Sequence, residues 1–300
     1  MLRSDLFFLK STILKHNGPP VKLPSFKLPF GKNYPDADAA PLADYILSFA
    51  SQSPEQRAYA TTHLGRLVRT LELTPKGAIS DHILEMGAYM QITPALKTKR
   101  GYGEVRGCYL GSLGRTDVKT VTSSKGETFR CEIDLFDAEK DRYPYPDENF
   151  ATVVCCELLE HLSSDPMHLM SEVNRILRPE GHLVLSTPNI SALRSVAAVL
   201  LGNHPGLYQQ FIRPRQGAAD PRHAREYTPS EMRRMFESAG FAVESMETGP
   251  YGLETPSGYE WAEQLLRERG LSLEFRGDTI HVVGRKTGPV RERFPNWLYD

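Results

Sequence analysis

The fold is decided by residues 143–189, which read YPYPDENFATVVCCELLEHLSSDPMHLMSEVNRILRPEGHLVLSTPN. Two apolar runs in this stretch, 151–156 and 182–187, are typical of strands that are buried on both faces. A helix is predicted between them, because Asp165 can cap its N-terminus and Pro166 suits its first turn. Strand, helix and strand then form a right-handed βαβ unit, so the stretch predicts a parallel sheet.

Strand patterns continue on both sides of this unit. Short apolar or alternating segments predict further strands at residues 82–87, 104–111, 129–136, 241–248 and 279–285. A capping box, Thr228-Pro229-Ser230-Glu231, predicts that a later helix begins there. The alternation of strands and helices predicts an α/β fold with a doubly wound, mostly parallel sheet.

The composition excludes several classes of protein. The chain has 300 residues, with 36 Lys and Arg against 37 Asp and Glu, and 40% of its residues are hydrophobic. These values are those of a globular protein and exclude a disordered or fibrous chain. Because there is no basic excess, we expect no nucleic-acid partner. No apolar run is long enough to span a bilayer, so we also expect no membrane partner.

Targeting and redox signals point to the cytoplasm. Charged residues interrupt the apolar N-terminus MLRSDLFFLKS, which argues against a secretory signal peptide. The 4 cysteines form no CxxC pair. We therefore expect reduced thiols and a cytoplasmic protein.

The block at residues 143–189 resembles the central block of class I S-adenosylmethionine-dependent methyltransferases. The resemblance is carried by the YPYPD turn, the ELLEHL helix start, the LRPEG turn and the STPN strand end. The later stretch REYTPSEMRRMFESAGF is also similar to the family, so the resemblance covers roughly residues 80–285. It implies a seven-stranded sheet with an antiparallel last strand, and S-adenosyl-L-methionine as the cofactor.

The sequence divides into three segments. Residues 1–35 read as a Pro-rich N-terminal strap, and residues 36–78 as a helical extension. Residues 79–300 would form the methyltransferase-like domain, in which an insertion at about residues 190–227 would build a substrate lid.

The resemblance implies a cofactor loop after the first strand, in the sequence ILEMGAYMQ. Contacts to the cofactor are implied for Glu85, Gly87, Ala88 and Tyr89. Tyr89 and Gln91 occupy two positions at which the family carries glycine.

Further cofactor contacts are implied after the next strands. Asp134 or Asp137 would accept the adenine amino group, although both acids can also simply solvate a turn. Cys156 follows the fourth strand and is a further candidate. Where the family has an acid that binds the ribose hydroxyls, this chain has Tyr109.

A second set of polar residues follows the fourth strand. Glu157, Glu160 and His161 fall at positions i, i+3 and i+4, which predicts that they share one helical face. We expect Glu160, His161 and the later His223 to be catalytic, since such groups can orient a substrate or accept a proton. A subset of methyltransferases binds a divalent metal through such a set. The same triplet also braces the helix without a metal, and no metal is assigned here.

The predicted lid insertion is rich in arginine. Its basic side chains are Arg213, Arg215, Arg222 and Arg225. They can form a solvated face, or they can bind a phosphate or carboxylate of the acceptor.

Taken together, the sequence predicts an enzyme that transfers a methyl group to a small or carbohydrate-like acceptor, which can be anionic. The alternative is a non-catalytic binding or assembly module of the same fold that has lost cofactor binding, since the glycine-rich loop is incomplete. A nicotinamide-linked oxidoreductase is set aside, because Gly101, Gly103 and Gly107 lack the G-x-G-x-x-G spacing.

Overall fold

The structure, a computed structural model, describes residues 26–27, 33–34, 39–50, 53–207, 222–250 and 258–300. Most of the predicted strap, and residues 208–221 of the predicted lid insertion, therefore lie outside the described residues. From the strap, only β1 (Phe26–Lys27) and β2 (Asn33–Tyr34) are described, and they pair antiparallel. Among the described residues, no helix has the length and apolar character needed to cross a bilayer.

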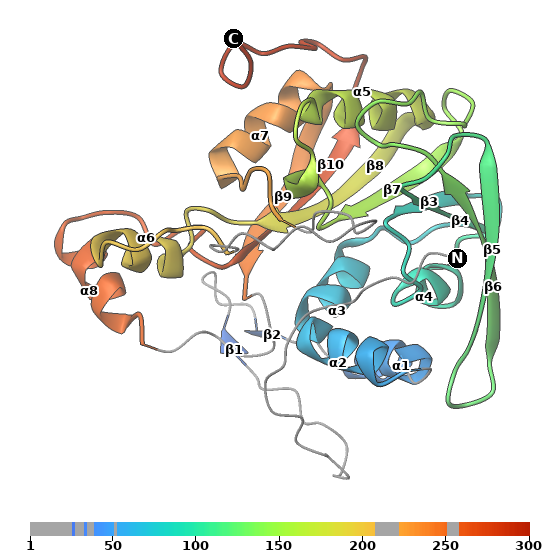
Figure 1. Cartoon of the computed structure of the whole chain (residues 1–300), viewed down its shortest axis with the longest axis horizontal. Coiled ribbons are helices and arrows are strands. Elements are labelled where there is room, and N and C mark those ends of the chain that lie inside the picture. Colours follow the sequence, from blue (N-terminus) through green and yellow to red (C-terminus); the bar gives the residue numbers. More distant parts are fainter. Residues whose placement is uncertain (1–25, 28–32, 35–38, 51–52, 208–221, 251–257) are drawn as a thin grey trace.

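One large sheet runs through the molecule (Figure 1). Its strand order is β5-β6-β4-β3-β7-β8-β10-β9. The strands are β3 (His82–Met86), β4 (Glu104–Tyr109), β5 (Arg115–Thr122), β6 (Thr128–Leu135), β7 (Phe150–Cys156), β8 (Leu177–Pro188), β9 (Phe241–Gly249) and β10 (Thr279–Lys286). Strands β6, β4, β3, β7 and β8 are parallel, and β10 lies antiparallel between β8 and β9. The predicted parallel sheet with an antiparallel last strand is confirmed.

The sheet has 8 strands, so the expected number of seven was wrong. The additional strand is β5, which pairs antiparallel with β6 at the edge of the sheet. Its sequence RTDVKTVT leaves most side chains exposed and buries only Val121. Backbone pairing rather than side-chain burial holds such an edge strand, so hydrophobic periodicity gives little signal for it.

Helices cover both faces of the sheet (Figure 1). One hydrophobic cluster joins α1 (Ala39–Phe49), α2 (Pro54–Thr62), α3 (Leu64–Leu73) and α4 (Thr93–Thr98) to one face. A second cluster joins α5 (Pro166–Ile176) and α7 (Pro229–Ser238) to the other. The adjacent residues Ile83 and Leu84 belong to different clusters, as the alternation of side chains along a strand requires. The sheet is therefore doubly wound, as expected.

Two further helices lie away from the sheet. They are α6 (Leu193–Leu200) and α8 (Glu260–Glu268), which contact each other. In Figure 1 this pair extends to one side of the body of the molecule. Both come from connections that follow the carboxyl ends of strands, β8 for α6 and β9 for α8.

The predicted helix starts are confirmed by their caps. The side chain of Asp165 accepts a hydrogen bond from the N–H group of His168 at 3.0 Å, and Pro166 opens α5. At α7, Thr228 and Glu231 form the reciprocal capping box. These side chains satisfy N–H groups that have no partner within the helix, and so they fix where each helix begins.

We expect Thr228→Ala to lower the free energy of unfolding by about 1 kcal/mol, because an N-cap hydroxyl is lost. For a chain of this size the melting temperature would fall by about 2 °C. Thermal melts followed by circular dichroism measure this change. Thr228→Ser keeps the hydroxyl and is the matched control; an equal loss in both variants would show that the cap is not the cause.

Candidate functional site

The candidate residues lie where the parallel strands end. Strands β3, β4, β6, β7 and β8 run in the same direction, so their carboxyl ends meet at one edge of the sheet. Ligands of open α/β sheets bind at this edge. It carries both the residues expected to bind a cofactor and those expected to be catalytic.

Glu85 lies near the end of β3 and is buried. Its Oε2 atom has no hydrogen-bond partner among the described residues. Burial raises the pKa of this carboxyl group from 4.5 to about 7, although a hydrogen bond with Thr93 opposes the shift. A buried carboxylate oxygen without a donor fits a ligand that carries an N–H or ammonium group, as S-adenosylmethionine does.

The loop after β3 is held against β4. The N–H groups of Gly87 and Ala88 donate to the carbonyl oxygen of Cys108 at 3.0 and 3.3 Å. Gly87 has a φ of 70°, and a Cβ atom added there would meet only the Tyr89 ring, at 4.0 Å. The backbone beside Gly87 is therefore open to a close approach by a ligand.

The two residues that follow Ala88 in this loop, Tyr89 and Met90, have unusual environments. The Tyr89 side chain is 57% exposed, so its ring lies on the surface of the loop rather than in the core. Met90 adopts a left-handed φ of 70°, a conformation that is costly for a residue with a Cβ atom. Backbone strain of this kind is often found at functional sites.

The two acids after β6 have different environments. Asp134 accepts hydrogen bonds from Arg106 on β4 at 2.8 Å and from Thr116 on β5 at 2.7 Å. It therefore ties three strands together, and its carboxylate is occupied. Asp137 is partly exposed and accepts from the N–H group of Glu139 at 2.9 Å. Of the two expected adenine contacts, Asp137 is the one that the structure leaves accessible.

Cys156 lies at the end of β7, and its Sγ atom is 3.6 Å from Oγ1 of Thr70 on α3. Burial raises the pKa of the thiol, which therefore stays protonated and is a poor nucleophile. Cys156 can pack against a ligand in the site, but its thiol is not a nucleophile there.

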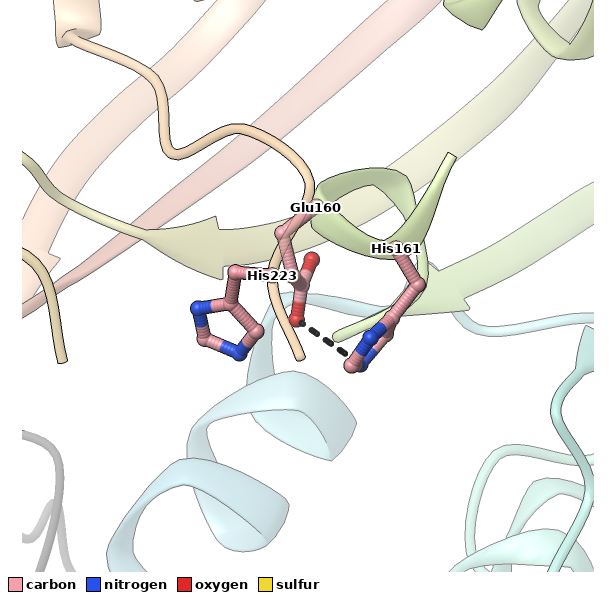
Figure 2. A group of neighbouring side chains, drawn as sticks. All are labelled: Glu160, His161 and His223. Carbon is pink, nitrogen blue, oxygen red and sulfur yellow. Dashed lines mark ion pairs between the residues drawn. The ribbon is translucent and has the colours of Figure 1, made fainter. Parts of the chain in front are cut away.

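Glu160, His161 and His223 come together at the end of β7 (Figure 2). One ligand atom from each lies within 4.8 Å of the others. The Oε1 atom of Glu160 is 3.9 Å from Nε2 of His161, and the two imidazole rings are 5.2 Å apart between centroids. The three residues expected to be catalytic thus form one cluster, which we call the histidine cluster.

Glu157 is not part of this cluster, so its predicted place on the same helical face was wrong. Residues Leu159–His161 form only a short 3-10 turn, and Glu157 precedes it with a left-handed φ of 52°. Its carboxylate instead accepts from Oγ of Ser186 at 2.9 Å and lies 3.8 Å from Arg66 of α3.

The position of His223 depends on backbone hydrogen bonds. The carbonyl oxygen of Glu160 accepts from the N–H groups of Ala224 and Arg225, at 2.7 and 3.2 Å. The carbonyl oxygen of Arg222 lies 3.1 Å from Nδ1 of His161. These contacts hold the segment that precedes α7 against the turn that follows β7.

Glu160 is fully enclosed within this arrangement. Its Oε2 atom accepts from Oγ1 of Thr187 at 3.0 Å. Burial, followed by the nearby charge of Glu157, raises the pKa of the Glu160 carboxyl well above its usual range. The hydrogen bond with Thr187 opposes this shift.

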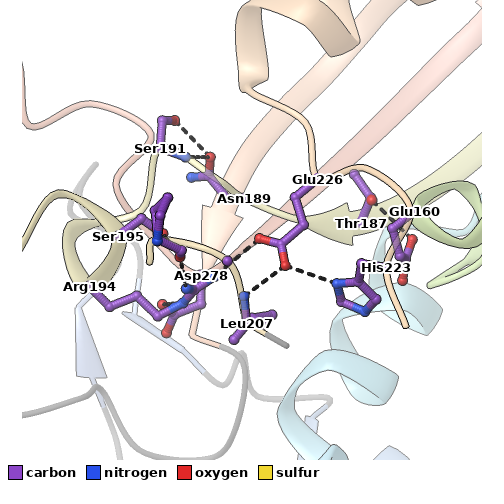
Figure 3. Close-up of polar contacts among 12 residues, drawn as sticks. Glu160, Thr187, Asn189, Ser191, Arg194, Ser195, Leu207, His223, Glu226 and Asp278 are labelled. Atoms are coloured by element: carbon purple, nitrogen blue, oxygen red, sulfur yellow. Dashed lines mark hydrogen bonds and ion pairs between the residues drawn. The ribbon is translucent and has the colours of Figure 1, made fainter. Parts of the chain in front are cut away.

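A buried carboxylate orients His223 (Figure 3). Glu226 accepts from Nδ1 of His223 at 2.9 Å and from the N–H group of Leu207 at 2.8 Å. Although burial opposes the shift, these hydrogen bonds lower the pKa of Glu226, so it is ionised. Arg194 bridges Glu226 and Asp278, at 3.7 and 3.2 Å. A carboxylate partner of this kind fixes both the tautomer and the direction of an imidazole.

The expected arginine site is only partly described. Arg213 and Arg215 lie outside the described residues. Arg225 pairs with Glu231 at 2.5 Å, and its guanidinium lies 5.4 Å from the ring centroid of Tyr227. It therefore braces the start of α7 in addition to any contact with an acceptor.

Sequence reasoning missed three residues of the site. They are Arg66, the buried partner of Glu157; Glu226, which orients His223; and Lys119, which contacts Tyr109. Glu226 stands three residues after His223, a spacing that could have suggested a pair. For Arg66 and Lys119, no local pattern indicates that their side chains turn inward.

Comparisons with known proteins show which sequences and folds this chain resembles. Residues 115–246 match a family model described as a methyltransferase domain. A Mycolicibacterium smegmatis protein named as an S-adenosylmethionine-dependent methyltransferase is 31% identical over 112 residues, which span 37% of this chain and 36% of that protein. The ubiquinone biosynthesis O-methyltransferase of Aeromonas salmonicida is 33% identical over 170 residues, which span 57% of this chain and 66% of that enzyme.

Among solved structures, one similar fold is in the complex between the Haloferax volcanii Trm112 methyltransferase activator and a methyltransferase. It is 17% identical and has a TM-score of 0.50, with 82% of this chain and 98% of that chain covered. The fold and site define a Rossmann-like methyltransferase domain. Over residues 115–246 the sequence matches a methyltransferase domain, and the fold is that of class I S-adenosylmethionine-dependent methyltransferases, while the chain spans less than two thirds of the length of the two relatives named above.

Glu85 should make the free energy of unfolding depend on pH. Its pKa is about 7 in the folded chain against a usual 4.5, so the folded state holds this proton more tightly than the unfolded state. The contribution of Glu85 is therefore favourable below about pH 4.5 and is lost as the pH rises through about 7, by up to roughly 3 kcal/mol. We expect Glu85→Gln to be more stable than the parent at pH 8.5 and to differ little at low pH.

The measurement is the difference in melting temperature between parent and variant, taken at pH 5 and pH 8.5. Glu237→Gln, at an exposed position on α7, is the control. A difference that does not depend on pH would show that Glu85 does not titrate in this range.

Proposed function

We propose that this chain transfers a methyl group from S-adenosylmethionine to a hydroxyl group of a small molecule. One observation carries the proposal: the histidine cluster lies along the same edge of the sheet as the buried Oε2 atom of Glu85, which has no partner among the described residues. The first fits a cofactor, and the second fits a proton acceptor for the substrate. The ubiquinone biosynthesis O-methyltransferase, a relative over part of the chain, is named for small-molecule chemistry of this kind.

When bound, S-adenosylmethionine supplies a methyl group that a sulfonium makes electrophilic. The residues that would hold it are Glu85, Gly87, Ala88 and Asp137, with the ring of Tyr89 beside the loop. Methyl transfer depends mainly on alignment, so a loop that still positions the donor suffices for catalysis.

The tautomer of His161 suits it to accept a proton. Its Nδ1 atom faces the carbonyl oxygen of Arg222 at 3.1 Å, and a carbonyl oxygen can only accept, so Nδ1 carries the hydrogen. The neutral ring then has its lone pair on Nε2. There it can take the proton of the acceptor hydroxyl as the oxygen attacks the methyl carbon. His223, which Glu226 orients, would help to place the acceptor.

The charge and chemical class of the acceptor are inferred from the sequence alone. A carbohydrate-like or anionic acceptor is proposed because of the arginine-rich insertion, of which Arg222 and Arg225 are described. Because Arg225 already pairs with Glu231, it gives less support to an anionic acceptor.

Cofactor binding is the first test of this function. We expect isothermal titration with S-adenosylmethionine and S-adenosylhomocysteine to give low- to mid-micromolar dissociation constants, about −7 to −8 kcal/mol. With binding established, release of S-adenosylhomocysteine in the presence of a panel of small hydroxyl compounds identifies the acceptor. His161→Gln should abolish turnover while cofactor binding persists.

A different result supports the alternative function. If millimolar cofactor gives neither heat nor thermal stabilisation, the chain is a non-catalytic module of the methyltransferase fold. The replacement of glycine by Tyr89 and of the ribose-binding acid by Tyr109 favours that alternative.

The histidine cluster also has the donor set of a divalent metal site. Glu160, His161 and His223 would hold the cation, and Arg222 and Glu226 would orient the two imidazoles as outer partners. A cation there would polarise the acceptor oxygen.

If the histidine cluster is a metal site, the chain should bind a divalent cation, and this binding should require His161 and His223. We expect titration of the chain with manganese alone to show one binding event, which His161→Ala and His223→Ala each abolish. The control is His182→Ala, a change on β8 at a histidine that pairs with Glu244. Chelator-insensitive turnover together with no manganese binding would contradict the metal site and leave His161 as the base.

A further inference from the structure

The additional strand β5 forms one outer edge of the sheet (Figure 1). It pairs antiparallel with β6 along all of its 8 residues, and no described strand pairs with its outer side. This pairing contains no β-bulge, and the sequence RTDVKTVT contains neither proline nor glycine. A regular edge strand of this kind is a template on which another strand can pair.

The outer side of β5 presents the backbone groups of its even-numbered residues. The N–H group of Ser123 donates to the carbonyl oxygen of Glu127 at 2.8 Å, in the same register as the strand pair. The odd-numbered residues of β5 therefore exchange hydrogen bonds with β6, because such positions alternate along an antiparallel pair. The N–H and C=O groups of Thr116, Val118 and Thr120 face away from β6 and can bond to a further strand.

The side chains of β5 separate onto two faces. Asp117 and Lys119 are opposite Ile133 and Cys131, which both belong to the first hydrophobic cluster, so the two charges share one face of the sheet. Val118 lies between them and points to the other face, where its side chain is 50% exposed. The strand thus carries two opposite charges on either side of a central apolar residue.

This arrangement makes β5 complementary to itself. When two copies are paired antiparallel with Val118 opposite the partner's Val118, Asp117 is opposite the partner's Lys119, and Lys119 is opposite the partner's Asp117. In the same register, Thr116 is opposite the partner's Thr120. Opposite charges, threonine pairs and β-branched apolar pairs are all favourable across two antiparallel strands.

The charges also select this register over its neighbours. Moving the two-fold axis by one residue would place Asp117 opposite the partner's Asp117, or Lys119 opposite the partner's Lys119, and like charges repel there. Within one chain the ammonium group of Lys119 contacts the neutral hydroxyl of Tyr109, which does not balance its charge. Burial lowers the pKa of Lys119 and the charge of Asp117 raises it, so a second carboxylate nearby would stabilise the charged lysine.

We propose that β5 pairs with the β5 strand of a second copy of this chain, so that the two sheets join across a two-fold axis at Val118. Each Val118 would exchange two backbone hydrogen bonds with the partner's Val118. Because the joined strands are antiparallel, the carboxyl edges of the two sheets would lie at opposite ends of the dimer. Each copy would then keep a complete site of its own.

Charge reversal tests this pairing. We expect sedimentation velocity at about 1 to 100 μM to show a dimer of the parent that forms with increasing concentration. Asp117→Lys and Lys119→Asp should each weaken self-association by about tenfold or more, because each change places like charges at two symmetry-related pairs. An equal mixture of these two variants restores opposite charges at both pairs. It should form a heterodimer about as readily as the parent forms its dimer, which also shows that both variants are folded.

Hydrogen–deuterium exchange locates the interface on the strand. The N–H groups of Thr116, Val118 and Thr120 should exchange rapidly in dilute protein and become protected as the concentration rises. The N–H groups of Asp117 and Lys119 bond to β6, so they should be protected at every concentration. This alternation is specific to pairing at the outer side of β5.

Two further variants form a matched pair. Val118→Lys places two ammonium groups on the two-fold axis and should prevent dimerisation. Leu271→Lys introduces the same charge at an apolar side chain of similar exposure, 55%, that follows α8. It should leave the dimer unchanged, since α8 lies on the opposite side of the molecule from β5 (Figure 1).

Three results would overturn the proposal. The first is a parent that stays monomeric over the whole concentration range. The second is a dimer in which the outward N–H groups of β5 remain unprotected or charge reversal has no effect, because that dimer uses another surface. The third is protection of these N–H groups in the monomer, which would show that another segment of the same chain pairs with β5.

Discussion

Parallel pairing of the five central strands is the constraint on which the rest of the structure depends. Parallel strands cannot be joined by a tight turn, so each connection must cross over. Two of these connections carry a helix, α4 between β3 and β4 and α5 between β7 and β8, and the two helices cover opposite faces of the sheet. The same directionality places the ends of β3, β4, β6, β7 and β8 at one edge. Residues that are distant in sequence, such as Glu85 and Glu160, therefore lie along the same edge of the sheet.

Much of this fold could be predicted because its signals are local. The apolar run 151–156 is buried on nearly every side chain, and the caps at Asp165 and Thr228 act within four residues of themselves. The edge strand β5 could not be predicted in the same way. This strand is held by backbone hydrogen bonds to β6. Its polar sequence RTDVKTVT shows no alternation of apolar and polar residues that would mark a buried face. The strand β5 is also the one by which this sheet differs from the expected seven-stranded pattern.

The candidate site could be predicted in residue type but not in arrangement. Motif spacing singled out Glu160, His161 and His223, and the structure brings them together. Residue spacing alone does not explain this cluster. It depends on hydrogen bonds from N–H groups around Ala224 to the carbonyl oxygen of Glu160. Glu157 was misplaced because a single left-handed residue ends the helical periodicity that the prediction assumed. Long-range hydrogen bonds and exceptional φ angles leave no trace in residue spacing.

The electrostatics at the end of β3 suit a ligand group that carries a positive charge and a hydrogen-bond donor. Burial raises the pKa of Glu85 to about 7 while one of its oxygens has no partner among the described residues. An ammonium group placed there would supply the missing donor and lower that pKa, so binding would release a proton near neutral pH.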